Sequence, residues 1–328
     1  MIRSALLLLA LALQDATGAK QAPPLPPAPP LPGETGAAPV DPAIAALVPG
    51  AMPAGAAPVA VEDWKRVLAA TSVPGAVLAP ISAFQLELEV VYRKNAEAGS
   101  NDLRATYKFF APGFVRIDLK DRSTMRGPRG DWLEDRKAGQ KVELSVGREH
   151  AEDRRQLDET LGIAKHFVAL THPGSLRLAS LEKLPGPPAA LPKAKEKDFD
   201  LEKRAGELSW LRVRSPDFRL VGGGATAPMT RATLGFDPKT GRVEIALLEE
   251  DRAAPGLTAT ARALRLDKSL EAQGYVVPKR IYVYSVEEGK LPAAFAPIPG
   301  MELFVVRANL APALGPPDFQ LPQDPAPR

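Results

Sequence analysis

The sequence predicts an α+β, mainly β protein in which a curved antiparallel sheet is covered by one long helix and a short N-terminal helix. Two observations carry this prediction. Nonpolar and polar residues alternate along many short segments, whereas only one long segment has helical spacing. The strand-like and helical segments also do not alternate as they do in parallel βαβ folds. Antiparallel sheets of this size curl, so a single helix can cover the hollow side.

The segment 82–94 carries the clearest strand pattern, because nonpolar residues at even positions alternate with mostly polar residues at odd positions. The segment 103–110 repeats the alternation. A nonpolar side chain contributes about 1.5–3 kcal/mol when it is fully buried, so these two strands supply a large part of a core. The side chains expected to face inward are Phe84, Leu86, Leu88, Val90, Tyr92, Leu103, Ala105, Tyr107 and Phe109.

The remaining strands are expected on both sides of one long helix. The helix is predicted over residues 151–170, where Leu157, Leu161 and Phe167 belong to a set spaced by three and four, and Pro173-Gly174 ends it. A short helix is predicted near residues 61–68, and a polar surface excursion over residues 185–203. The other strands are predicted at 114–120, 123–126, 131–135, 141–146, 207–214, 231–236, 242–248, 258–266, 280–286 and 301–309.

The N-terminal segment predicts export. Arg3 followed by the apolar run Ala5–Leu13 is typical of a signal peptide, here residues 1–19, and the run is shorter than the ~20 residues that span a bilayer. Residues 20–60 are rich in Pro and Ala and are predicted to be a disordered linker. The folded domain is expected over residues 61–322, followed by a disordered tail at 323–328, in a monomeric periplasmic protein.

Composition excludes several kinds of function. The 328 residues include no cysteine, so no disulfide, thiol nucleophile or thiolate metal site can form. The 42 Lys and Arg residues exceed the 39 Asp and Glu residues by a net charge of only +3. Basic residues such as Arg116 and Arg122 are interspersed with Asp118 and Asp121, so the chain lacks a basic stripe that would follow a nucleic-acid backbone. We therefore expect no nucleic-acid partner.

Two short motifs raise a serine-hydrolase hypothesis. Ser180-Leu181-Glu182-Lys183 fits the S-x-x-K pattern, and Lys239-Thr240-Gly241 fits the K-T-G element of penicillin-binding enzymes. That chemistry needs the serine at the start of a buried helix, but Ser180 lies in a strand-like run and Thr240 lies in a predicted hairpin turn. We expect no enzymatic activity, and hydrolysis is the least favoured of the hypotheses.

Metal and cofactor sites are also not expected. The three histidines, His150, His166 and His172, do not have the spacing that puts two zinc ligands on one helix face. The triplet Gly222–Gly224 lacks the G-x-G-x-x-G spacing of a phosphate-binding loop. The remaining feature is the apolar sheet face, which either closes into an ordinary core or stays partly open around a ligand. From the patterning alone, the ordinary core is favoured.

The order of the elements resembles the periplasmic lipoprotein-carrier (LolA-like) superfamily, as a divergent member. The similar stretches are the opening strand 84–92, the strand-turn-strand segment 107–116, the hairpin 237–242 and the segment Asp318–Pro322, which resembles the terminal strand of the family. The resemblance implies an incomplete antiparallel barrel whose concave apolar surface receives acyl chains, with the helix at 151–170 near its opening.

The resemblance therefore implies a non-enzymatic protein that binds an acyl or lipid-like ligand, with a lipoprotein among the candidate cargoes and transient contact with a membrane surface. The alternative is a protein-interaction or envelope-sensor module that keeps the same core filled. The candidate cavity-lining residues are Phe84, Leu86, Leu88, Val90, Tyr107, Phe109, Leu161 and Phe167.

Overall fold

The computed structural model describes residues 46–92, 101–111, 113–144, 150–189, 191, 195–196, 199–218, 230–250, 261–284 and 299–320. The predicted signal peptide, most of the predicted linker, the glycine triplet 222–224 and the predicted tail lie outside these residues.

Strands dominate the described chain. Before the long helix α4 (Ala151–Thr171) come the short helix α3 (Pro58–Ala70) and the strands β1 (Ala83–Tyr92), β2 (Asn101–Phe110), β3 (Phe114–Asp118), β4 (Arg122–Gly127), β5 (Gly130–Asp135) and β6 (Gln140–Glu143). After α4 come β7 (Ser180–Leu184), β8 (Lys195–Glu196), β9 (Phe199–Asp200), α5 (Leu201–Glu207), β10 (Ser209–Ser215), β11 (Thr230–Phe236), β12 (Val243–Glu250), β13 (Ala261–Ala272), β14 (Tyr275–Tyr284) and β15 (Met301–Asn309).

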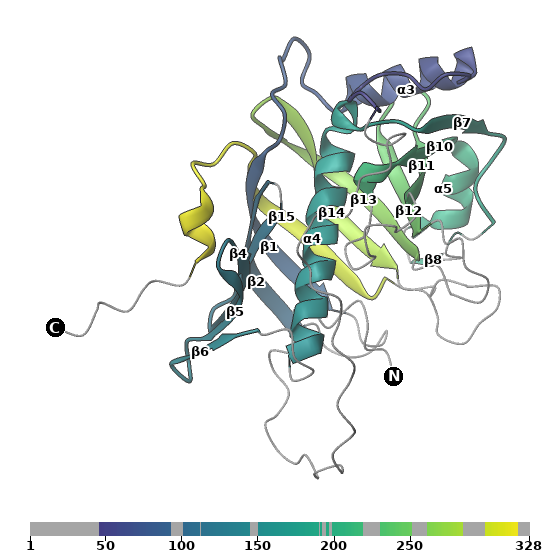
Figure 1. Ribbon diagram of the computed structural model, residues 1–328. Helices are drawn as coiled ribbons and strands as arrows, with labels where there is room; N and C mark the ends of the chain where they lie inside the picture. Colours follow the sequence, from purple (N-terminus) through teal and green to yellow (C-terminus); the bar gives the residue numbers. More distant parts are fainter. Residues whose placement is uncertain are drawn as a thin grey trace, which may run out of the picture.

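Thirteen of these strands form one sheet in which every neighbouring pair is antiparallel. The order is β6-β5-β4-β3-β2-β1-β15-β14-β13-β12-β11-β10-β7. Two antiparallel halves, β1–β6 and β7 with β10–β15, thus meet where β1 pairs with β15, and β8 and β9 form a separate two-stranded sheet. The sheet is curved and is not closed into a barrel, with β6 and β7 at its edges (Figure 1). The predicted fold class is confirmed.

Helix α4 connects the two edge strands β6 and β7, so its path takes it across one face of the sheet (Figure 1). The face that α4 covers is called the inner face below. Side chains of α4 pack there against β1, β2, β14 and β15, whereas α3 packs against β7 and β10–β12. Both helices therefore contribute to one continuous layer over the inner face, as the sequence predicted for a single long helix and a short N-terminal one.

The outer face is covered by two smaller elements. Helix α5 packs against β10 and β12, and the indole N–H of Trp210 donates to the main-chain oxygen of Ala205 (2.9 Å). A short 3-10 turn, η5 (Pro316–Phe319), covers β2–β4 near the C-terminus. The ring of Phe319 lies 6.3 Å from that of Phe110, and a Cβ added to Gly127 would lie 1.8 Å from the Phe319 oxygen. Only glycine fits beneath this turn.

Three sequence expectations differ from the structure. The segment 318–322 was expected to be a strand, but its described part ends the η5 turn, because Pro316 and Pro317 provide no N–H for a sheet ladder. The excursion predicted at 185–203 runs into the helix α5, whose Asp200 cap accepts from the Lys203 N–H (3.0 Å). The short N-terminal helix begins at Pro58, three residues before the expected domain start at Val61.

Strands β13 and β14 are also longer than predicted. They are joined at Gln273 and Gly274, whose φ angles of 45° and 81° are typical of a tight hairpin turn. Lys268, at φ 53°, breaks the alternation of β13 in the middle. The alternation of nonpolar and polar residues is lost at such an irregularity. The strand predicted from that alternation therefore ended at residue 266, although β13 continues to Ala272.

Candidate functional site

An aromatic cluster fills the space between α4 and the first two strands of the sheet. Phe84 of β1 lies at its centre, with ring centroids 5.5 Å from Tyr107, 5.2 Å from Phe109 and 5.0 Å from Phe167 of α4. Antiparallel pairing sets this arrangement, because Phe84 lies opposite Phe109 and Leu86 lies opposite Tyr107. The helix contributes Phe167 from its last turns, so strand and helix residues form one apolar surface.

All eight residues proposed from the sequence as cavity lining belong to this cluster. Their exposed fractions range from 0% to 9%, so the side chains contact one another rather than water. The structure therefore brings all eight residues together in one buried cluster, and their role as the wall of a ligand site stays a prediction.

A hydrogen bond crosses from the sheet to the helix within the cluster. The hydroxyl of Tyr107 donates to the main-chain oxygen of Thr160. At the N-terminal end of α4, Arg122 of β4 forms an ion pair with Asp153 (3.4 Å). The interface between these two points is built mainly from nonpolar side chains. Such contacts are non-directional, so other nonpolar groups can replace them.

Strands β14 and β15 add residues that the sequence did not nominate. Met301 and Val305 of β15 and Val277 of β14 are buried in the same cluster, and the main-chain pairing places Val90 beside Leu303. The alternation in 301–309 was the available signal. It did not say that this strand pairs with β1, more than two hundred residues earlier in the chain.

The inner face beneath α3 forms a second cluster with a different character. Trp64 is fully buried there. The buried Asp63 accepts hydrogen bonds from the ammonium group of Lys183 on β7 and from Arg66 (3.0 Å). Gly241 lies against α3, where an added Cβ would lie 2.3 Å from the Arg66 oxygen. Directional contacts and close backbone approach therefore fix α3 on the sheet.

A buried cluster of charged and aromatic groups lies on the outer face of β13–β15. The guanidinium of Arg265 lies 3.6 Å from the centroid of the Tyr282 ring and 4.0 Å from that of Phe199. Arg280 stacks on the other side of this region and pairs with Glu302 (2.8 Å). Burial raises the pKa of the Tyr282 hydroxyl. The stacking contacts and the ion pair are all made between residues of the sheet and its outer layer, so we assign the cluster to sheet structure.

The serine-hydrolase motifs do not form a site. Ser180 and Lys183 are three residues apart on β7, so their side chains point to opposite faces of the sheet. Lys183 is engaged by Asp63 on the inner face. Asp237, two residues before the second motif, accepts from the main-chain N–H groups of Thr240 (3.1 Å) and Lys239 (2.8 Å), and these bonds hold the pKa of its carboxyl below the ordinary value. Lys239-Thr240-Gly241 is therefore a structural turn.

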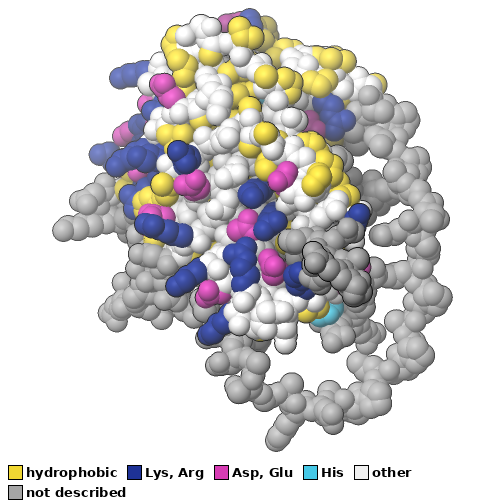
Figure 2. Space-filling view, turned by 90° about the vertical axis from the view of Figure 1, so that its left-hand side faces the viewer, with side chains coloured by type: hydrophobic (Ala, Val, Ile, Leu, Met, Phe, Trp, Pro, Cys, Tyr) yellow, Lys and Arg dark blue, Asp and Glu magenta, His cyan; other side chains and the backbone are white. Residues whose placement is uncertain are grey.

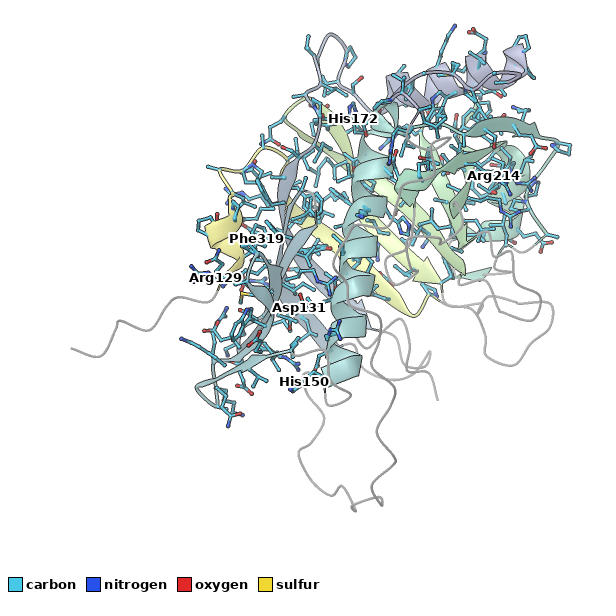
Figure 3. The ribbon with its side chains drawn as sticks, viewed as in Figure 1. Arg129, Asp131, His150, His172, Arg214 and Phe319 are labelled. Carbon is cyan, nitrogen blue, oxygen red and sulfur yellow. The ribbon has the colours of Figure 1, made fainter. Side chains whose placement is uncertain are left out.

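The histidines are distributed along α4. His150 and His172 lie at its opposite ends (Figure 3), and His166 is buried within it. Among the residues that the structure describes, no group of three or more His, Asp or Glu side chains could hold a metal ion. Burial lowers the pKa of His172, whose ring lies edge-on to Tyr275 at 5.4 Å. No helix within the described ranges is long and apolar enough to cross a membrane.

The fold and the site together define a class of protein: an open antiparallel sheet with a helix crossing its inner face over an apolar cluster. No family model matches the chain, and no curated protein matches it significantly.

Solved structures are similar over most of the chain. A LolA superfamily protein from Nitrosomonas europaea is 11% identical, with 78% of this chain and 97% of that chain covered and a TM-score of 0.40. An outer membrane lipoprotein-sorting protein domain from Vibrio parahaemolyticus is 9% identical (79% and 95% covered, TM-score 0.35). A DUF1329 family protein from Desulfovibrio piger is 10% identical (80% and 94% covered, TM-score 0.36).

Proposed function

We propose that the protein is an exported, non-enzymatic binder of an acyl or lipid-like ligand, which it holds between α4 and the inner face of β1 and β2. One observation carries the proposal. Helix α4 connects the edge strands β6 and β7 and is not part of the hydrogen-bonded ladder of the sheet. It covers the sheet mainly through nonpolar side chains. It can therefore move away from β1 and β2 while every strand pair of the sheet is kept.

A hydrocarbon chain would replace the contacts that α4 gives up. Burial of a methylene contributes about 0.8 kcal/mol, so about ten methylenes offer roughly 8 kcal/mol, near micromolar affinity before ordering costs reduce it. The wall on the sheet side consists of Phe84, Leu86, Leu88, Val90, Tyr107 and Phe109, and the helix supplies Leu161 and Phe167. The polar end of the ligand would remain at the rim, where water is available.

The cellular part of the proposal is periplasmic transport. The apolar run at Ala5–Leu13 would direct export, and the segment 20–60 would separate the domain from the cleavage site. A lipoprotein is one candidate cargo, since its acyl chains have the required chemistry. Fractionation of the expressing cells and N-terminal sequencing of the mature protein test this part, and a chain that retains residues 1–19 in the cytoplasm would contradict it.

The ligand itself is tested on protein expressed with its signal peptide. Native mass spectrometry should find co-purifying lipid, and a fluorescent fatty-acid probe should bind and be displaced by unlabelled fatty acid. Phe84→Leu should lower the affinity for the probe, whereas a change of equal size under α3, Trp64→Phe, should leave the affinity unchanged. Absence of both lipid and probe binding would end the proposal.

A second function has a specific observation in its favour. The eight lining side chains are all buried in contact with one another, as in a module that keeps a filled core and binds proteins or senses envelope conditions. Leu88→Glu separates the two functions. A permanently filled core should unfold with this charge, whereas a ligand site that opens to water should tolerate it while losing the probe.

A further inference from the structure

Three uncharged segments meet at the end of the molecule where the described chain begins. Residues 46–61, 71–86 and 167–176 contain no Asp, Glu, Lys or Arg, although these types make up 25% of the chain. Main-chain hydrogen bonds hold the first and third together, since Gly50 donates to the oxygen of Leu176 (3.0 Å). We call the surface formed by these three segments the apolar end.

Strand β14 joins the second segment to the third. The hydroxyl of Tyr275 donates to the main-chain oxygen of Ala79, and the Tyr275 ring lies against His172. On the other side, Leu68 of α3 and His172 both lie 3.7 Å from the position of an added Cβ on Gly174. The apolar end is therefore one continuous surface.

Most exposed large hydrophobic side chains of the described residues belong to the apolar end. Val48 is 62% exposed, Met52 37%, Val59 56% and Val77 97%. The fifth such residue, Val306, is 57% exposed on β15. Figure 2 shows hydrophobic side chains gathered toward the upper end of the molecule, with the charged side chains mostly below and to the left.

The exposure of Val77 follows from a built turn. Pro74 and Gly75 occupy the central positions of a type II turn, with Gly75 at φ 81° and the Ala76 N–H donating to the Val73 oxygen (3.0 Å). Val73 in turn donates to Gly274 of the β13–β14 hairpin (2.8 Å). The chain beyond Val77 is anchored by Ile81, which is buried in the cluster under α4. Val77 is thus held in water at the tip of a supported loop.

We propose that the apolar end enters the interfacial region of a phospholipid bilayer, with Val77 leading. Entry there requires no charged side chain of the three segments to lose its hydration, which is the main obstacle to membrane contact. Proline adds no N–H donor that would need a partner in the lipid, and both Pro74 and Pro80 are exposed beside Val77.

The connection to the rest of the chain favours a bilayer over a protein surface. Residues 1–45 join the described chain at residue 46, within the apolar end, and include the apolar run Ala5–Leu13. The predicted signal peptide would therefore hold this end of the domain near the membrane until residues 1–19 are removed. The three segments also offer no Asp, Glu, Lys or Arg with which to pair a charged protein partner.

The test uses the mature chain and protein-free vesicles of phosphatidylethanolamine and phosphatidylglycerol. The wild type should float with the vesicles, and Val77→Asp should lower the vesicle partition coefficient about tenfold or more, since losing one buried valine already has that effect. Val306→Asp is the matched control and should bind as the wild type does. Val77→Trp should shift its fluorescence to the blue when vesicles are added. Circular dichroism checks that each variant is folded.

The inference does not depend on the acyl ligand. Probe binding without flotation, or flotation that Val77→Asp leaves unchanged, would overturn it and leave the proposed function standing. Flotation of the wild type without probe binding would overturn the proposed function and leave the bilayer inference standing. Binding to envelope vesicles that contain protein, combined with none to protein-free vesicles, would overturn the bilayer as partner in favour of a membrane protein.

Discussion

The two halves of the inner face are held by different kinds of contact. Beneath α4, the rings of Phe84 and Phe167 and their nonpolar neighbours meet around one hydrogen bond from Tyr107. Beneath α3, a buried Asp63 accepts from Lys183 and a glycine lies directly against the helix backbone. The contacts of α4 with the sheet are mainly apolar, beside the Tyr107 hydrogen bond and the ion pair between Arg122 and Asp153, whereas α3 is fixed by a buried ion pair and by close backbone approach.

This difference indicates where a ligand can be accommodated without loss of the fold. Displacing α3 would separate the carboxylate of Asp63 from the ammonium group of Lys183, and breaking a buried ion pair is costly. Displacing α4 exposes nonpolar surface that a hydrocarbon chain can cover again. The α4 half is therefore the binding half of the proposed carrier, and the α3 half is its fixed base.

The largest effect is expected from removing the central ring of each half. Phe84→Ala and Trp64→Ala should each lower the free energy of unfolding by about 3–5 kcal/mol, because both side chains are fully buried. Only Phe84→Ala should also lower the affinity for the fatty-acid probe. Urea denaturation and probe titration measure the two effects, and the milder Phe84→Leu serves if the alanine variant does not fold. Equal probe loss in both variants would erase the contrast.

The ion pair beneath α3 gives a smaller effect. Lys183→Met should cost about 2 kcal/mol of unfolding free energy, since the buried Asp63 keeps only Arg66 as its charged partner. Probe affinity should stay within twofold of the wild type, because the change lies outside the α4 cluster. Lys183→Arg is the control and should recover most of the stability. A variant as stable as the wild type would contradict the assigned role of this pair.

The hydrogen bond between Tyr107 and α4 affects kinetics more than stability. Tyr107→Phe should cost about 1 kcal/mol and should speed probe association, because α4 is less firmly held over β1 and β2. Tyr275→Phe is the control, because it removes a hydroxyl bond to the main-chain oxygen of Ala79 rather than to the helix. Stopped-flow mixing should therefore find faster association for Tyr107→Phe alone.

The smallest effect is a pH dependence at the end of α4. Burial lowers the pKa of His172 below its unfolded value of about 6.5, so the unfolded chain binds the proton more readily. Stability from this group is complete above about pH 6.5 and is lost as the pH falls from there toward the folded pKa. Urea midpoints measured between about pH 5 and pH 8 should decline less steeply for His172→Gln than for the wild type.

Much of this architecture followed from local pattern. The alternation in segment 82–94 identified the inward face of β1 because an antiparallel strand with one solvated side has a period of two. The helix predicted at 151–170 is observed at Ala151–Thr171. In β13 the positive φ of Lys268 interrupts the alternation of side chains, so the alternating pattern ends before the strand does.

The members of the apolar cluster under α4 were predictable from the sequence, whereas the strands that surround them were not. All eight nominated residues meet under α4, since face alternation and helical spacing each select one side. The contribution of β15 was not predictable, because the pairing of strands far apart in the chain is decided by the whole sheet. The η5 turn was mistaken for a strand, and its proline pair was the signal against that interpretation.

The contact between Gly127 and Phe319 has a consequence for biogenesis. The aromatic rings of Phe110 and Phe114 belong to the second and third strands along the chain, whereas the turn that covers them is made only after all the described strands. Until the turn is made, the nascent chain carries an uncovered aromatic pair. A chain cut after residue 314 would keep its hydrogen-bonded ladder and nevertheless tend to aggregate through that pair.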